Sequence, residues 1–337
     1  MAFTQHGTEV HLVDQTGVLH DTLPVANYMV KVRPNGHFYL VVVDEFQLPA
    51  RFYGKHTRYL QRIMQTYTGR HDSMGVLLTG IKGSGKSLLA KNIAAECAGL
   101  GMPTLIINEP LCGSGFNEFM QNINQPCVVL FDEFEKVYDR EQQDSLLTLL
   151  DGTATGKNLW VFTCNNQHRV NDFLINRPGR VHYRIDYTTL ADTFIEDYCN
   201  EHLQDTTQMQ AIANYATLFD DFNFDMLRAI VDELNRYGGT VADAVEMLNV
   251  RPVFRDMANY QVSILTDGNT VASEHTWYGN PLTEANVQFS IDDHEYNMTM
   301  KDLTEIDTRS GVYVYERDGV AVTLKRTVTQ FDYTRVF

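Results

Sequence analysis

Short apolar runs alternate with amphipathic helical patterns through the middle of this chain. A short continuous apolar run is typical of a strand that is buried on both faces of a parallel sheet. Such runs, separated by segments with helical spacing, lie at 76–79, 104–108, 127–131, 159–163 and 181–185. Strands that alternate with helices predict an α/β fold, in which helices sandwich a parallel five-stranded sheet.

The segment before this core has a different pattern. Apolar and polar residues alternate at 9–13 and 30–33, the mostly apolar run 37–43 is a strong strand signal, and turn-forming residues occupy 34–36. This alternation predicts a β-rich N-terminal segment over residues 1–54. Helical spacing begins just after it, at about 55–67, and opens the core over residues 55–187.

The segment after the core changes pattern twice. Residues 188–250 carry apolar stripes at helical spacing and predict a helical lid, with helices at 189–202, 208–218, 225–237 and 240–248. Period-two alternation returns over 251–337 and predicts a β-rich C-terminal domain. Its strongest signal is Asp318-Gly319 between two alternating runs, which predicts a β-hairpin.

The loop after the first core strand has the residues of a phosphate-binding loop. It reads G-I-K-G-S-G-K-S from Gly80 to Ser87 and fits the pattern G-x-x-x-x-G-K-[ST]. Chance produces this pattern in roughly one chain of this length in a hundred, and the strand before it and the helix after it make chance a poorer explanation. Glycines let the backbone N–H groups turn towards a polyphosphate, and the helix N-terminus adds partial positive charge. The predicted nucleotide-binding residues here are Gly80, Gly83, Ser84, Gly85, Lys86, Ser87 and Leu88.

A second element turns the prediction from nucleotide binding to hydrolysis. The apolar run 127–131 ends in Asp132 and Glu133. Ligands of open α/β sheets bind outside the carboxyl ends of the strands, so these carboxylates are expected to face the phosphate loop. With ATP bound, Lys86 would reach the β- and γ-phosphates, Ser87 and Asp132 would hold Mg²⁺, and Glu133 would polarise the attacking water. An acidic pair can also be a solvated helix start, but its place in the chain after the loop favours the catalytic interpretation.

Composition narrows the class of protein further. The chain of 337 residues has a formal net charge of −16, which disfavours binding to nucleic-acid backbones. Its five scattered cysteines indicate a reducing compartment, and we expect a cytoplasmic protein, in the host cytoplasm if a phage encodes it. No apolar run is long enough to predict a membrane span, and the N-terminus does not have the pattern of a signal peptide.

With a phosphate loop, an acidic strand end, five strands and a helical segment in this order, residues 55–250 resemble the AAA branch of the AAA+ ATPases. Three further motifs carry the resemblance: Leu149-Leu150-Asp151-Gly152, Thr163-Cys164-Asn165-Asn166, and Asn176-Arg177-Pro178-Gly179-Arg180-Val181. The last motif is most similar to that of the mitochondrial Rieske-protein translocase subgroup. The residue usage also resembles that of phage AAA proteins.

The resemblance implies roles for three more residues. Asn165 would be the sensor that hydrogen-bonds the attacking water or the γ-phosphate, although a turn-forming Asn is the simpler alternative. Arg177 and Arg180 would act on the nucleotide of a neighbouring subunit, where a guanidinium stabilises the transferring phosphoryl group; the alternative is a surface pair on a turn. Action in trans requires a homo-oligomer, which the family implies to be a hexamer.

Two other positions stay open between a functional and a structural role. Phe116 follows the second core strand, where AAA+ proteins place a substrate-gripping pore loop, but the usual aromatic–hydrophobic–glycine pattern is missing. Arg228 in the helical segment is either a lid arginine that contacts the γ-phosphate or a solvated helix residue.

We therefore expect an ATPase, with ATP and Mg²⁺ as cofactors, that remodels or translocates a protein substrate or acts on it through an adaptor. The alternative is a nucleic-acid-linked ATPase such as a clamp or helicase loader. A phosphotransferase with a small acceptor is a third class, which the paired arginines disfavour.

Overall fold

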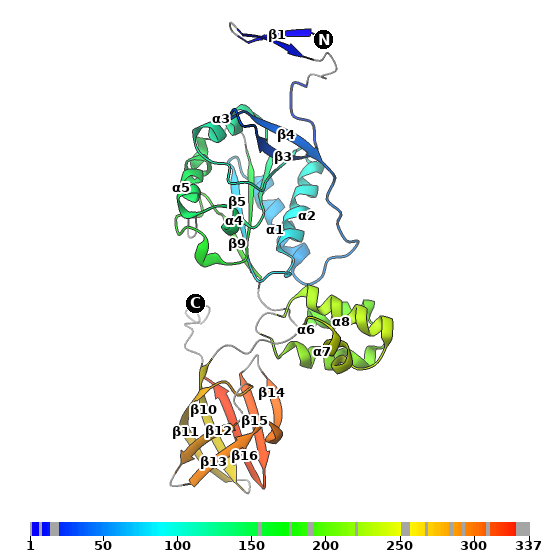
Figure 1. Ribbon diagram of the computed structural model, residues 1–337, viewed down its shortest axis with the longest axis vertical. Helices are drawn as coiled ribbons and strands as arrows, with labels where there is room; N and C mark the ends of the chain where they lie inside the picture. Colours follow the sequence, from blue (N-terminus) through cyan, green and yellow to red (C-terminus); the bar gives the residue numbers. More distant parts are fainter. Residues whose placement is uncertain are drawn as a thin grey trace. The chain divides into compact units, whose positions relative to one another are not determined.

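The computed structural model describes residues 2–6, 9–13, 20–153, 157–174, 177–187, 190, 192–219, 222–250, 257–266, 269–282, 286–291, 294–307 and 311–327. The chain divides into two compact units, Met1–Tyr187 and Thr188–Phe337 (Figure 1). The finer division into four domains stays a prediction. Among the described residues, no helix has both the length and the apolar character that crossing a membrane requires.

A seven-stranded sheet organises the first unit. Its strand order is β4-β3-β6-β7-β8-β5-β9. The five predicted core strands are all present, as β5 (Met74–Gly80), β6 (Thr104–Ile107), β7 (Val128–Phe131), β8 (Leu159–Cys164) and β9 (Tyr183–Tyr187). Neighbours among them run parallel, so their carboxyl ends lie along one edge. The predicted α/β architecture is confirmed.

The sheet is nevertheless larger than the five strands predicted. β3 (Asn27–Val32) pairs in parallel with β6, and β4 (Phe38–Val43) pairs antiparallel with β3. Both strands belong to the segment that the sequence pattern separated from the core. They form one side of the sheet, with β4 as the edge strand: β3 buries Tyr28 and Val30, while β4 has no fully buried residue. A separate hairpin of β1 (Ala2–His6) and β2 (Glu9–Val13) precedes them.

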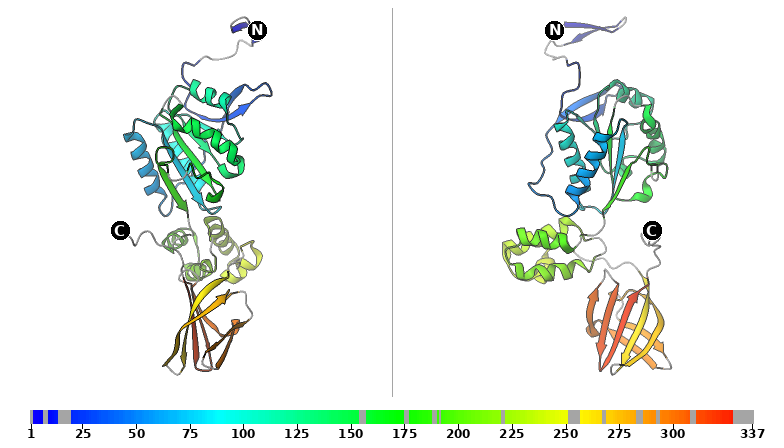
Figure 2. Two further views of the ribbon diagram at one scale, coloured as in Figure 1. Left: turned by 90° about the vertical axis from the view of Figure 1, so that its left-hand side faces the viewer. Right: turned by 180° about the vertical axis from the view of Figure 1, so that it is seen from behind.

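Helices cover both faces of this sheet (Figure 2). On one face, α1 (His56–Gly69) and α2 (Lys86–Gly99) pack on residues such as Val76 and Leu78 of β5. On the other, α3 (Ser114–Asn122), α4 (Phe134–Val137), α5 (Arg140–Thr148) and the π-helical turn η1 (Leu149–Thr153) pack on β6, β7 and β8. Alternate residues of β5, β7 and β8 therefore pack into two different cores.

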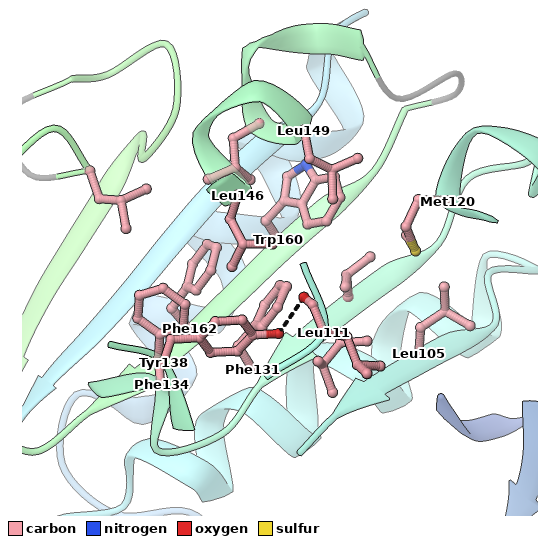
Figure 3. Close-up of a cluster of buried hydrophobic side chains, with 14 of the residues drawn as sticks. Leu105, Leu111, Met120, Phe131, Phe134, Tyr138, Leu146, Leu149, Trp160 and Phe162 are labelled. Atoms are coloured by element: carbon pink, nitrogen blue, oxygen red, sulfur yellow. Dashed lines mark hydrogen bonds between the residues drawn. The ribbon is translucent and has the colours of Figure 1, made fainter. Parts of the chain in front are cut away.

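The second of these cores is aromatic and lies directly behind the acidic strand end. Phe131 stacks on Phe162 with 4.8 Å between ring centroids, and Phe134 packs edge-on against Phe162. Tyr138 is buried in the same cluster and donates a 2.9 Å hydrogen bond to the carbonyl oxygen of Leu111 (Figure 3). Offset and edge-to-face ring pairs add about 1 kcal/mol each beyond area burial. This packing gives the end of β7 a rigid base.

The second unit begins with helices and continues with strands. Its helices are α6 (Asp192–His202), α7 (Met209–Ala216), α8 (Phe224–Tyr237) and α9 (Val241–Met247), close to the four predicted ranges. The Thr240 side chain accepts a hydrogen bond from the backbone of Asp243 and so caps α9, as Ser or Thr does before many helices. Short 3₁₀ turns lie at η2 (Gln167–Arg169), η3 (Thr206–Gln208) and η4 (Met300–Asp302).

The strands after residue 257 form two antiparallel sheets. The larger has the order β11-β10-β16-β15-β14, and β12 pairs with β13 in the smaller. The predicted hairpin is present: β15 and β16 meet at Asp318-Gly319, where φ is 52° and 78°, as a tight hairpin turn requires. Side chains from both sheets share one apolar core. The bounds are β10 (Ala258–Thr266), β11 (Asn269–Gly279), β12 (Asn286–Ile291), β13 (His294–Thr299), β14 (Leu303–Asp307), β15 (Val312–Arg317) and β16 (Val320–Arg326).

Candidate nucleotide-binding site

The phosphate loop joins the end of β5 to the start of α2. Its glycines at 80, 83 and 85 have φ values of 127°, 73° and 97°, a region that L-residues with side chains rarely adopt. Gly85 is the N-cap of α2, so the loop leads its backbone directly into a helix N-terminus. Such a terminus binds anions through unpaired N–H groups and the helix dipole.

Gly80 has a second constraint beside its dihedral angle. A Cβ atom at this position would lie 2.0 Å from the backbone oxygen of Tyr187, the last residue of β9. Only glycine therefore lets β9 lie against the loop. The Tyr187 ring lies near Gly85 and Tyr59, and burial raises the pKa of its hydroxyl.

Lys86, the first residue of α2, is only 5% exposed. Its ammonium donates hydrogen bonds to the carbonyl oxygens of Gly80, at 2.8 Å, and Ile81, at 2.6 Å. The side chain thus curls back over its own loop, where phosphate oxygens would be bound. Burial lowers the pKa of Lys86, and nearby Glu135 is the largest of the charges that oppose this shift.

A short chain of hydrogen bonds connects this loop to the acidic strand end. The Ser87 hydroxyl donates to Oδ1 of Asp132 at 2.9 Å. The Thr163 hydroxyl, near the end of β8, donates to the same oxygen at 2.5 Å and accepts from the backbone N–H of Glu133 at 2.9 Å. Thr163 therefore ties the ends of β7 and β8 together beside Ser87.

Glu133 has an unusual backbone conformation. Its φ is 49°, which places a residue with a side chain in the left-handed region at the start of α4. Conformations of this kind cost of the order of 1 kcal/mol and cluster at functional sites. The carboxylate accepts from the Lys136 ammonium at 2.5 Å and from Nδ2 of Asn165 at 3.2 Å. The hydrogen bond from Lys136 is the main reason that the pKa of Glu133 lies below its ordinary value.

The structure thus brings five predicted residues to one edge of the sheet: Lys86, Ser87, Asp132, Glu133 and Asn165. They lie in the segments that follow β5, β7 and β8, which are neighbours in the sheet. Leu88 lies on the same helix as Ser87 and is partly buried.

The two predicted arginines lie on one turn but in different surroundings. Arg180 is 8% exposed and forms a two-pronged ion pair with Asp151, through Nε and Nη2 at 2.5 Å each. Its Nη1 donates to the carbonyl oxygen of Phe173 at 2.8 Å. This pair lowers the pKa of Asp151 and raises that of Arg180. Arg177 is exposed.

The structure shows the contacts of Phe116 and Arg228, whose roles the sequence left undecided. Phe116 lies on α3 with its side chain fully buried, 5.8 Å from the ring of Phe38. It packs the core and is not presented for gripping a substrate. Arg228 is exposed on α8, and its Nε lies 3.5 Å from the carboxylate of Asp232 one turn along the helix.

Three residues at the site received no role from the sequence: Thr163, Glu135 and Asp151. Thr163 and Asp151 lie inside motifs that were quoted for their neighbours. The sequence feature that could have pointed to them is a polar residue at the end of a predicted strand or helix. What they contact depends on the sheet order, which one sequence does not reveal.

Comparison with known proteins agrees with this geometry. Residues 76–188 match the model of the ATPase family associated with various cellular activities (AAA). Residues 76–188 therefore form an AAA ATPase domain within this chain. The matched segment begins in β5 and ends just after β9, so it includes every residue of the hydrogen-bonded chain described above.

The chain is also similar to curated proteins over part of its length. The chain is 34% identical over 133 residues to the ATP-dependent zinc metalloprotease FTSH 6, chloroplastic, of Arabidopsis thaliana. This alignment covers 32% of this chain and 18% of the relative. It is 25% identical over 265 residues to FTSH 8, chloroplastic, of the same plant, covering 69% of this chain and 36% of the relative. An FtsH 2 protease of Phytoplasma mali is 29% identical over 188 residues, covering 47% and 26%. The chain thus spans at most about a third of the length of these relatives.

The residues present fit the ligands of this family, ATP and Mg²⁺. The Ser87 hydroxyl and the Asp132 carboxylate offer adjacent oxygen atoms, the ligand type that Mg²⁺ prefers. The glycine loop, the N-terminus of α2 and the Lys86 ammonium offer donors and positive charge to a triphosphate.

Proposed function

We propose that this protein hydrolyses ATP at the phosphate loop, that several copies assemble to do so, and that hydrolysis remodels a protein substrate. The observation that carries the proposal is the hydrogen-bonded chain from Ser87 through Asp132 and Thr163 to Glu133 and Asn165. It links a triphosphate-binding loop to a carboxylate and an amide at the neighbouring strand ends. A site for binding alone has no need of the last two groups.

Each residue has a distinct task in this account. Lys86 exchanges its loop carbonyl partners for the β- and γ-phosphates. Ser87 and Asp132 would hold Mg²⁺, which would supply positive charge next to the phosphoryl oxygens. Glu133 accepts a proton from the attacking water, and Asn165, already hydrogen-bonded to Glu133, orients that water. Phosphoryl transfer depends on this kind of positioning and electrostatic stabilisation.

The arginine turn supports assembly of several copies. Arg177 is exposed, and Arg180 is fixed three residues along the same turn by Asp151. A guanidinium supplied by a neighbouring copy raises phosphoryl-transfer rates by about 10³–10⁵. We infer that this turn completes the site of the adjacent copy, and the resemblance implies a ring of six.

A protein substrate is favoured over a nucleic acid for two reasons. The relatives are named as ATP-dependent proteases, and the net charge of −16 repels phosphate backbones. Proteolysis is not part of the proposal, because the sequence has no H-E-x-x-H motif. Because Phe116 is buried, any grip on the substrate comes from other residues.

Phosphate release with two variants tests the proposal. Lys86→Ala should abolish nucleotide binding, because no other ammonium in the loop is placed as Lys86 is. Glu133→Gln should keep the affinity for ATP and lose about 10²-fold or more in kcat, the usual cost of removing a general base. Glu141→Gln, at an exposed position on α5, is the matched control and should match wild type. Turnover by Glu133→Gln at the wild-type rate would remove Glu133 from the mechanism.

The same assay identifies the substrate class. We expect an unfolded protein to stimulate phosphate release and duplex DNA to have no effect. Stimulation by DNA alone would favour a nucleic-acid-linked ATPase instead.

A further inference from the structure

Glu135 is a buried carboxylate beside the nucleotide site. It is the second residue of α4 and is 7% exposed. Among the described residues, no other Asp or Glu is buried to this extent. Burying an ionised carboxylate costs several kcal/mol unless other groups compensate. Its position therefore needs a reason beyond the helix start that it occupies.

Its contacts point to the end of β8. Oε1 of Glu135 accepts a 2.9 Å hydrogen bond from the backbone N–H of Asn165, the first residue after that strand. Oε2 is buried and has no hydrogen-bond partner within the described part of the chain. The thiol of Cys164 lies next to the carboxylate, and burial together with Glu135 raises its pKa to about 12, which keeps the thiol neutral.

The hydrogen bond from the Asn165 backbone to Glu135 also affects the position of the Asn165 side chain. Nδ2 of Asn165 donates to Oε1 of Glu133 at 3.2 Å. Glu133 and Glu135 thus hold the same residue from two sides, one through its side chain and the other through its backbone. Fixing the backbone N–H fixes the point from which the amide reaches Glu133.

We propose that Glu135 is a positioning residue, which holds the backbone of Asn165 so that its amide stays aligned with Glu133 during ATP hydrolysis. This inference rests on the proposed function. Glu135 makes no contact with the reacting groups and acts through Asn165. A displacement of about 1 Å in such a group lowers rates by up to roughly 10²-fold.

Two substitutions separate the hydrogen bond from the volume of the side chain. Glu135→Met fills similar space but has no acceptor for the Asn165 N–H, whereas Glu135→Gln keeps one. We expect Glu135→Met to lose roughly ten- to a hundred-fold in kcat with KM changed by less than about threefold, and Glu135→Gln to keep most of kcat. Glu141→Met, on the exposed face of α5, is the control. If Glu135→Met does not fold, Glu135→Asp, whose carboxylate is one methylene too short, provides the same contrast.

A double-mutant cycle shows whether Glu135 acts through Asn165. In an Asn165→Ala background, Glu135→Met should reduce kcat by no more than about twofold further, because the amide that it positions is already gone. Fully multiplicative losses would overturn the proposal and leave Glu135 with a structural role only.

Hydrogen exchange of the nucleotide-free protein gives a readout that does not depend on turnover. The amide of Asn165 should exchange about tenfold faster in Glu135→Met than in wild type or Glu135→Gln. Unchanged exchange in Glu135→Met would overturn the inference.

The outcomes also distinguish this inference from the proposed function. A wild-type protein that releases no phosphate overturns ATP hydrolysis itself. Normal kcat in Glu135→Met, with an impaired Asn165→Ala, overturns only the role of Glu135.

Discussion

At the scale of single residues, Arg177 and Arg180 lie three residues apart on one turn but differ in their contacts. Arg180 uses its guanidinium within its own subunit, on Asp151 and the Phe173 carbonyl, whereas Arg177 is exposed. The guanidinium fork matches a carboxylate in this two-pronged geometry, and lysine does not replace it. We infer that Arg180 shapes the turn from which Arg177 extends.

Replacing each arginine should therefore have different effects on stability. Arg180→Ala and Asp151→Asn should each lower the free energy of unfolding by about 1–2 kcal/mol, a value reduced because the Asp151 carboxylate is half exposed. Arg177→Ala should leave it unchanged within about 0.5 kcal/mol while lowering phosphate release. Chemical denaturation followed by circular dichroism measures this difference. Equal stability of all three variants would mean that the Asp151 pair does not hold the turn.

The sequence predicted some residues of the site better than others, for physical reasons. Lys86 and Ser87 follow from a loop pattern, since glycine dihedrals and a helix start within a few residues define it. Asp132 and Glu133 follow from their place after an apolar strand. Thr163 and Glu135 were missed, because their importance comes from contacts across neighbouring strands.

At the scale of elements, a buried histidine joins α1 to α2. His56, the first residue of α1, is 7% exposed and stacks on Phe52 with 4.2 Å between ring centroids. Nδ2 of Asn92 on α2 lies 3.1 Å from Nε2 of His56. Burial lowers the pKa of His56 from 6.5 to about 4, so the folded protein holds this imidazole neutral where the unfolded chain would protonate it.

This contact should make the stability of the protein depend on pH. The unfolded chain binds a proton at His56 below about pH 6.5 and the folded protein only below about pH 4, so stability is lost as the pH falls between these values. The loss attributable to His56 is about 3 kcal/mol. In His56→Gln this part of the slope should disappear, whereas His71→Gln, at an exposed position, should keep it. Denaturation curves at pH 7 and pH 4.5 measure the slopes, and identical slopes in His56→Gln and wild type would contradict the account.

Elements were predicted well where the pattern was local. The five core strands and four helices of the second unit follow from apolar periodicity alone. Periodicity did not reveal that β3 and β4 extend the sheet beyond β6, since strand pairing across about 75 residues leaves no local signal.

The need for glycine at position 75 also has no local signal in the sequence. A Cβ at this position would lie 2.1 Å from the backbone oxygen of Arg180, so glycine is needed there for the arginine turn to approach β5.

At the scale of the whole molecule, the proposed function requires a second copy of the chain to complete the nucleotide site. In the proposed mechanism the edge of the sheet supplies groups for binding ATP and for activating water, whereas Arg177 and Arg180 lie on a separate turn, where Arg180 is paired with Asp151. The proposed assembly accounts for this division of residues. The central claim is therefore that ATP is hydrolysed with groups from two copies of the chain.

Mixing two inactive variants tests this claim most directly. One lacks both arginines of the turn (Arg177→Ala with Arg180→Ala) but has an intact phosphate loop, and the other, Lys86→Ala, has the arginines but binds no nucleotide. Each alone should release almost no phosphate. Their mixture should recover a clear part of the wild-type rate, because mixed interfaces combine an intact loop with an intact arginine turn. Arg62→Ala, an exposed change on α1, should be active alone. No recovery in mixtures that form mixed assemblies would contradict the account.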